Sequence, residues 1–110
     1  MFVAIYRWKV VPELEERFEC AWSRITSMYV EQWRSGGSAL FRAHDGVYVG
    51  IARWQNREAR ARAFEAGPID SEASAELRAA VLTTFGDLEL ECIDDQWVSL
   101  CLPLRRIRGE

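Results

Sequence analysis

The stretch that decides the fold is Ser38-Ala-Leu-Phe-Arg-Ala-His-Asp-Gly-Val-Tyr-Val-Gly-Ile-Ala-Arg-Trp54. Its two β-rich runs, Ser38 to His44 and Val47 to Trp54, flank an Asp-Gly pair. Asp45-Gly46 is the pair that a two-residue type I′ turn prefers, so the stretch predicts a β-hairpin. With those two residues as the loop, the expected cross-strand pairs are His44–Val47, Arg42–Val49, Phe41–Gly50 and Ala39–Ala52.

Upstream of the hairpin, the chain predicts a strand and a long helix. Phe2 to Lys9 alternates, with Phe2, Ala4, Tyr6 and Trp8 on one face and Val3, Ile5 and Arg7 on the other. Pro12 suits the first turn of a helix, and apolar residues then repeat at three- and four-residue spacing from Leu14 to Tyr29. Gly36-Gly37 is expected to supply its left-handed end.

Downstream, two shorter helices and more strand are expected. Asn56 caps a run to Glu65, Gly67-Pro68 breaks it, and Asp70 caps a second run that Gly86 ends. The runs Leu88 to Ile93 and Gln96 to Leu102 are strand-like.

The resulting order, βαββαβ with a broken second helix, predicts an α+β fold of the ferredoxin-like plan. In that plan a four-stranded antiparallel sheet carries its helices on one face. The 110 residues suffice for one domain, and we expect a core over residues 1–102 and a basic tail over 103–110.

The sheet face away from the helices is too apolar to remain in water. We therefore expect another sheet to cover it, in a homodimer packed face to face as a dimeric α/β barrel. The residues expected at this interface are Val3, Ile5, Val47, Val49 and Ile51.

Composition excludes several classes of function. A net charge of −3 and a pI near 5.3 argue against nucleic acid or anionic lipid as a partner. No apolar run is long enough for a membrane helix or a signal peptide, so a cytoplasmic protein is expected. Three cysteines without CxxC spacing predict neither a disulfide framework nor a zinc site, and no nucleotide-binding or hydrolase motif occurs. The single histidine, His44, is expected to face solvent or the dimer instead of acting as a base.

On the helix-side face, small residues stand among large flat ones. Gly50 and Ala52 either leave a cavity or let a helix sit close, with Phe41 covering the gap above Gly50. Both alternatives stay open. If there is a cavity, the residues expected to bind a ligand in it are Trp8, Trp22, Ile25, Tyr29, Phe41, Tyr48 and Gly50.

Several of these features together resemble the antibiotic biosynthesis monooxygenase domain. They are the Phe2-Val-Ala-Ile-Tyr-Arg-Trp-Lys-Val strand, the Pro12-Glu helix start, the Gly36-Gly37 break, the Asp45-Gly46 hairpin and the strand-ending Trp54 before Asn56-Arg-Glu-Ala59. The resemblance covers about residues 1 to 100. It implies the dimeric α+β barrel fold that the two-faced strands also indicate.

Some members of that family oxidise anthrone-like aromatic polyketides with dioxygen and no cofactor, and others degrade haem. The haem-degrading branch has an asparagine on the first strand and a later helical histidine, whereas this chain has Tyr6 near the first position and no histidine after His44. The resemblance therefore implies a cofactor-free monooxygenase, with neither metal nor prosthetic group. Trp54 and Tyr6 are the candidate catalytic residues, because each joins a flat apolar body to a polar group. The alternative is a non-catalytic dimer that binds a small hydrophobic molecule.

Overall fold

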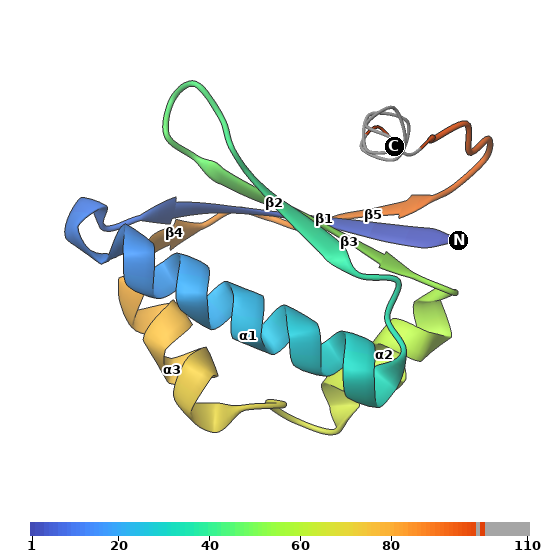
Figure 1. Ribbon diagram of the computed structural model, residues 1–110, viewed down its shortest axis with the longest axis horizontal. Helices are drawn as coiled ribbons and strands as arrows, with labels where there is room; N and C mark the ends of the chain where they lie inside the picture. Colours follow the sequence, from blue (N-terminus) through green and yellow to red (C-terminus); the bar gives the residue numbers. More distant parts are fainter. Residues whose placement is uncertain (99, 101–110) are drawn as a thin grey trace, which may run out of the picture.

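One antiparallel sheet with all its helices on one face makes up the described chain (Figure 1). The structure is a computed structural model that describes residues 1–98 and residue 100. Cys101, the expected tail over 103–110 and the end of the expected strand at Gln96 to Leu102 lie outside the described residues. In chain order the elements are β1 (Phe2–Val10), the 3-10 helix η1 (Pro12–Leu14), α1 (Glu15–Trp33), β2 (Ser38–Arg42), β3 (Tyr48–Trp54), α2 (Arg57–Glu65), α3 (Ser71–Ala80), β4 (Val81–Thr84) and β5 (Leu88–Glu91).

The strand order confirms the ferredoxin-like plan. The sheet runs β2-β3-β1-β4, and β5 also pairs with β1. It has five strands where four were expected, because β4 and β5 share one edge of β1. β4 pairs with the Trp8–Val10 end of β1, and β5 pairs with the Phe2–Ile5 end.

The predicted hairpin forms, but its register is wrong by one residue. Phe41 pairs with Val49, and Leu40 is the residue opposite Gly50. The loop has three residues instead of two, because Gly46 donates to the Ala43 carbonyl and Ala43 donates to Val47. Gly46 has a φ of 89°, which fits a type I turn closed by a left-handed glycine. Since side chains alternate along a strand, the shift moves Phe41 to the opposite face of the sheet.

Two further expectations near the C-terminal end are wrong. The second helix of the pair ends at Ala80, not at Gly86, and Val81 to Thr84 forms β4. Valine and threonine are β-branched and favour the strand there once β1 offers an edge. Residues 96–98 carry no strand, and the strand expected to reach Ile93 ends at Glu91.

The helix starts at Asn56 and Asp70 are confirmed, since their side chains accept hydrogen bonds from the Ala59 and Ala73 amides. The end of α1 differs from the expectation, because Arg34 takes the left-handed conformation, with a φ of 55°. Gly36 has a different role. A Cβ there would lie 3.0 Å from the Arg53 Cβ, so glycine lets the loop approach β3.

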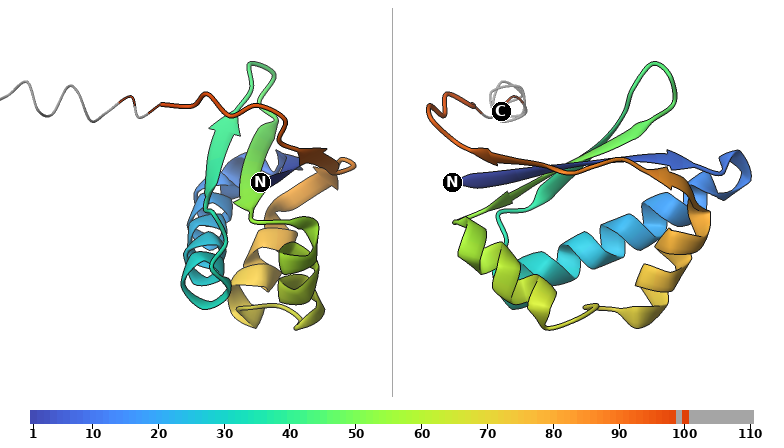
Figure 2. Two further views of the ribbon diagram at one scale, coloured as in Figure 1. Left: turned by 90° about the vertical axis from the view of Figure 1, so that its right-hand side faces the viewer. Right: turned by 180° about the vertical axis from the view of Figure 1, so that it is seen from behind.

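The helix-side face buries the core in two clusters. Phe2, Ala4, Ala52, Trp54 and Ala63 form one cluster, which lies toward α2. Val10, Phe18, Tyr48 and Ala80 form the other, which lies toward α3 and the start of α1. Figure 2 shows α1, α2 and α3 gathered on this one side. A core divided in this way leaves room between its halves.

The other face of the sheet carries no helix among residues 1–98 (Figure 2). On this face Ile5 of β1 pairs with Ile51 of β3, and Val3 of β1 pairs with Arg53 of β3. Val3, Ile5 and Ile51 are therefore apolar neighbours on the uncovered face. Phe41, Leu88 and Leu90 are also exposed large apolar residues in the strands of this sheet. None of the helices within residues 1–98 combines the length and apolar character needed to cross a bilayer.

Candidate functional site

A cavity of about 230 Å³ lies between the sheet and the helices. It is bordered by β1 and β3, by α1 and by single residues of α2 and α3. The residues expected from the sequence that line it are Tyr6, Trp8, Trp22, Ile25, Tyr29, Gly50 and Trp54. The small residues on β3 thus border a cavity, and at Gly50 they also allow the close approach of Trp22 from α1.

Trp54, at the end of β3, is the most buried aromatic residue of the cavity wall, with 4% of its surface exposed. Tyr29 and Phe64 pack edge-on against its ring, with centroids 5.8 and 6.2 Å away. Its indole Nε1 is buried and has no hydrogen-bond partner in the described chain. An unsatisfied buried donor costs about 1 to 3 kcal/mol.

Tyr6, on β1, is held by an arginine that comes from α2. Arg60 Nε donates to the Tyr6 hydroxyl oxygen at 2.9 Å. Because a guanidinium has no acceptor, the tyrosine hydrogen stays available for another partner. Burial raises the pKa of Tyr6, while the hydrogen bond and charge of Arg60 oppose that shift. The hydroxyl is therefore a neutral donor at ordinary pH.

Gly50 explains how two tryptophans and a cavity fit together. A Cβ at this position would lie 3.1 Å from the Trp8 ring and 3.4 Å from the Trp22 Nε1. Trp8 therefore lies over Gly50, and Tyr6 stacks on Trp8 with centroids 5.9 Å apart. The absence of a side chain on β3 thus allows a flat aromatic wall.

Phe41 is not brought to the cavity. It pairs with Val49 on the opposite face of the sheet and is 52% exposed. The expectation that it covers Gly50 is wrong because it depended on the two-residue hairpin loop.

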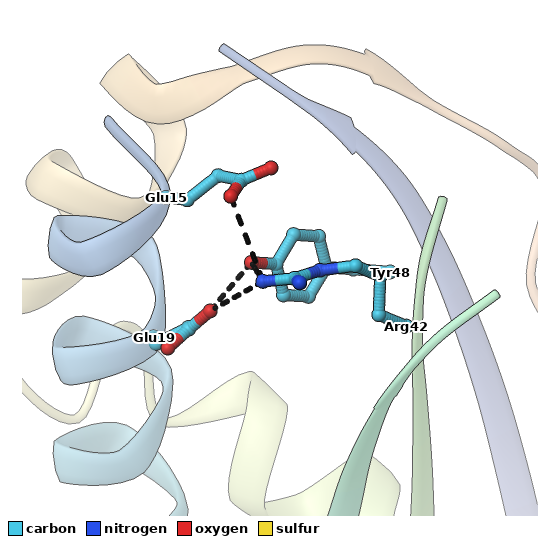
Figure 3. Close-up of polar contacts among 4 residues, drawn as sticks. All are labelled: Glu15, Glu19, Arg42 and Tyr48. Carbon is cyan, nitrogen blue, oxygen red and sulfur yellow. Dashed lines mark hydrogen bonds and ion pairs between the residues drawn. The ribbon is translucent and has the colours of Figure 1, made fainter. Parts of the chain in front are cut away.

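Tyr48 lies on the expected face but away from the cavity, buried against Phe18. Its hydroxyl donates to Glu19 and accepts from Arg42 at 2.8 Å, and Arg42 also contacts Glu15 and Glu19 (Figure 3). This network joins the hairpin to the start of α1. Both hydrogen-bonding capacities of the hydroxyl are filled, so Tyr48 has a structural role.

Other residues were missed by the sequence reasoning. Leu77 lies in the helical run expected after Asp70, and Ala52 on the expected face of the sheet, but no signal placed Phe64 beside Trp54. The additional lining residues are Thr26, Ser35, Ser38, Ala52, Phe64 and Leu77. Arg60 was also missed, because its contact with Tyr6 spans 54 residues of sequence.

The cavity wall offers few kinds of polar side-chain group. Its polar groups are hydroxyls and indole N–H groups, and no Asp, Glu, His, Lys or Arg of the described chain lines it. Within the described residues no cluster of His, Cys, Asp or Glu has the arrangement of a metal site. His44 is exposed in the hairpin loop. The cavity is therefore suited to a flat apolar molecule that offers hydrogen-bond acceptors.

Comparison with known proteins agrees with this architecture. No protein-family model matches the sequence, and no curated protein matches it. Among solved structures, the chain is similar to a single-residue variant of SnoaB, a cofactor-independent oxygenase from Streptomyces nogalater. The two are 25% identical, with a TM-score of 0.70 over 86% of this chain and 95% of SnoaB.

Two further structures share the fold at lower identity. One is described as an antibiotic biosynthesis monooxygenase, with 15% identity and a TM-score of 0.68 over 86% of this chain and all of that one (100%). The other is Rv0793 from Mycobacterium tuberculosis, with 17% identity and a TM-score of 0.68 over 87% of this chain and 98% of that one. The resemblance to the antibiotic biosynthesis monooxygenase domain is thus confirmed among structural neighbours.

Proposed function

We propose that this protein is a cofactor-independent monooxygenase that oxidises a small, flat, anthrone-like aromatic substrate in the cavity. The observation that carries the proposal is the aromatic cavity wall, whose side-chain polar groups in the described chain are hydroxyls and indole N–H groups, with the Trp54 Nε1 unpartnered among the described residues. Similarity to SnoaB, a cofactor-independent oxygenase, supports the reaction class.

The proposed chemistry belongs mainly to the substrate. A methylene conjugated with a carbonyl loses a proton and becomes an electron-rich carbanion, which reacts with dioxygen. Both C–H bonds finally break, one oxygen atom becomes the new carbonyl oxygen, and the other leaves as water with the two hydrogens. The substrate thus supplies all the electrons, and no external reductant is needed.

In this proposal the protein binds the substrate, orients it and stabilises its anion. Trp54 Nε1–H and the Tyr6 O–H are donors for the substrate oxygen on which negative charge gathers. Trp8, Trp22 and Tyr29 supply flat surfaces that hold the ring system and exclude water.

The test is oxygen consumption by the purified, metal-free protein with a simple anthrone. Uptake above the protein-free rate is expected for the wild type, and a loss of about a hundredfold or more for Trp54→Phe and Tyr6→Phe, since removing one such donor costs about 2.7 kcal/mol or more. Tyr48→Phe is the matched control, because its hydroxyl lies outside the cavity. Wild-type uptake at the background rate would overturn the oxygenase proposal.

A binding-only protein is the second candidate function. The observation that favours it is the cavity wall itself, which in the described chain offers no carboxylate or imidazole to remove a proton. Binding of an anthrone without oxygen uptake, weakened in Trp54→Phe, would establish this alternative.

We further propose that two copies pack through the open sheet face. Val3, Ile5, Val49 and Ile51 are neighbours there, and Leu88 and Leu90 remain 49% and 42% exposed. So much adjacent apolar surface favours burial against a like surface. Val47, just before β3, completes the interface predicted from the sequence.

Ile51→Glu tests this interface, because it buries an unpaired charge in the proposed dimer. Size-exclusion chromatography with light scattering should give a dimer for the wild type and a monomer for the variant at micromolar concentration. Ala79→Glu places the same charge on the exposed surface of α3 and should remain dimeric. A dimeric Ile51→Glu variant would contradict the interface.

A further inference from the structure

Arg60 is a partly buried cation directly behind the cavity wall. Its side chain is only 12% exposed, and its guanidinium carbon lies 4.6 Å from the Phe64 ring centroid and 5.5 Å from that of Tyr6. Both aromatic residues line the cavity, whereas Arg60 itself does not. Its charge can therefore act on a ligand through Tyr6 without touching it.

The acidic partners of Arg60 lie on its solvent side. Glu89 and Asp87 contact the terminal nitrogens at 3.3 and 3.6 Å and are 36% and 41% exposed. Glu89 is shared with Arg57, which it meets at 2.8 Å. The four charges sum to zero, but Arg60 meets the cavity residue Tyr6 through its Nε, whereas the two carboxylates contact its terminal nitrogens.

The hydrogen bond between the two residues has a fixed direction. Arg60 Nε donates and the Tyr6 oxygen accepts, so polarisation strengthens the tyrosine O–H as a donor toward the cavity. Within the part of the chain that the structure describes, the other charged or titratable groups acting on this hydroxyl are Asp87, from the segment before β5, and Tyr29, from α1. Arg60 is thus the single cation in the set.

We propose that the Arg60–Tyr6 pair makes the cavity bind its ligand preferentially as an oxygen anion, a phenolate or an enolate. This inference rests on the proposed function and deepens it, since the described cavity wall supplies no base. The ligand's O–H or activated C–H bond breaks heterolytically, the proton passes to solvent, and the electron pair remains on the conjugated ligand oxygen. Arg60 is a positioning residue that acts through Tyr6.

The test measures the pKa of a bound probe, 4-nitro-1-naphthol, whose visible absorption changes when its hydroxyl ionises. Wild-type protein should lower the pKa of the bound probe relative to Arg60→Met by about one unit. Arg60→Lys should restore part of the shift by keeping the charge. Asp87→Asn, which removes an opposing carboxylate, should move the probe pKa further down.

Two controls separate this effect from general damage to the fold. Arg57→Met also removes a cation from Glu89, but Arg57 lies over the Phe2 ring, is 66% exposed and, unlike Asp87, does not act on the Tyr6 hydroxyl, so the probe pKa should not change. The methyl ether of the probe cannot ionise, and its affinity should be equal in wild type and Arg60→Met.

The outcomes distinguish the inference from the proposed function. A bound probe with the same pKa in wild type and Arg60→Met, or a wild type that does not bind the probe, overturns the inference. Oxygen uptake with an anthrone decides the oxygenase proposal separately, whatever the probe shows. Opposite shifts in Arg60→Met and Asp87→Asn would support an electrostatic role, because a purely structural role has no reason to produce them.

Discussion

Residues 1–98 contain two arginine–tyrosine pairs of nearly the same chemistry, one in each half of the core. Arg42 with Tyr48 and Arg60 with Tyr6 each combine a hydrogen bond, at 2.8 and 2.9 Å, with a guanidinium over the ring, at 5.1 and 5.5 Å. Each arginine also has two acidic neighbours. The pairs differ in whether the tyrosine hydroxyl hydrogen is already donated to another residue.

Tyr48 gives its hydrogen to Glu19, and its arginine is 53% exposed, so the network is complete and solvated. Tyr6 only accepts, its arginine is 12% exposed, and the hydroxyl lies at a cavity. The comparison teaches that a residue pair does not by itself mark a site. A polar group becomes a candidate for ligand binding when the fold leaves one of its hydrogen-bonding capacities unused.

The largest expected effect tests whether the two halves of the core support the fold equally. Trp54→Ala and Tyr48→Ala each remove a buried aromatic ring and should lower the free energy of unfolding by about 3 to 5 kcal/mol. Urea denaturation measures both. If either loss were only that of a surface substitution, about 0.5 kcal/mol, that residue would not be part of the core.

The next effect concerns Gly50, which pairs with Tyr6 and stands two residues after Tyr48. Gly50→Ala should cost about 1 to 3 kcal/mol, because the new methyl group meets the Trp8 ring at 3.1 Å. Thermal or urea unfolding measures the loss. Gly86→Ala, where the added methyl meets nothing within 4 Å, is the matched control and should not destabilise.

The third prediction distinguishes the two arginine–tyrosine pairs most directly, because one variant should lose stability and the other should lose affinity for the probe. Tyr48→Phe should lower the free energy of unfolding by about 1 kcal/mol and leave affinity for 4-nitro-1-naphthol unchanged, because it removes only internal hydrogen bonds. Tyr6→Phe should weaken binding of that probe by about tenfold, since about 1.4 kcal/mol corresponds to one hydrogen bond of this kind. Binding titrations and urea denaturation check both. Equal loss of affinity in the two variants would remove the distinction between the pairs.

The smallest effect is the dependence of stability on alkaline pH. Burial raises the pKa of both Tyr6 and Tyr48 above the ordinary tyrosine value of 10.0, so the folded state holds these protons more tightly than the unfolded state. Their contribution is complete below pH 10 and is lost as the pH rises through the folded pKa. Urea denaturation between neutral pH and about pH 11 should show a smaller alkaline loss in each tyrosine-to-phenylalanine variant. If both variants lost as much stability at alkaline pH as the wild type, the buried tyrosines would not be the cause of that loss.

Local signals in the sequence predicted most of the elements. The alternation of β1, the caps at Asn56 and Asp70 and the break at Gly67 all depend on neighbours within a few residues, and the structure confirms them. The hairpin was predicted, but its loop was not, because an Asp-Gly pair suits a two-residue turn and also a three-residue loop with glycine left-handed. That one-residue difference decided the face on which Phe41 lies.

By itself, then, the sequence determined which face of β1 is buried, where α2 and α3 begin, and that Trp54 ends a strand beside small residues. Periodicity and capping are local properties, so they can be read from one chain. Tertiary structure alone decided that Val81 to Thr84 is a strand, that Arg60 meets Tyr6, and that the Trp54 N–H has no partner among the residues described. Each of these depends on groups brought together from distant segments, because edge pairing and hydrogen-bond satisfaction are settled only when the layers pack.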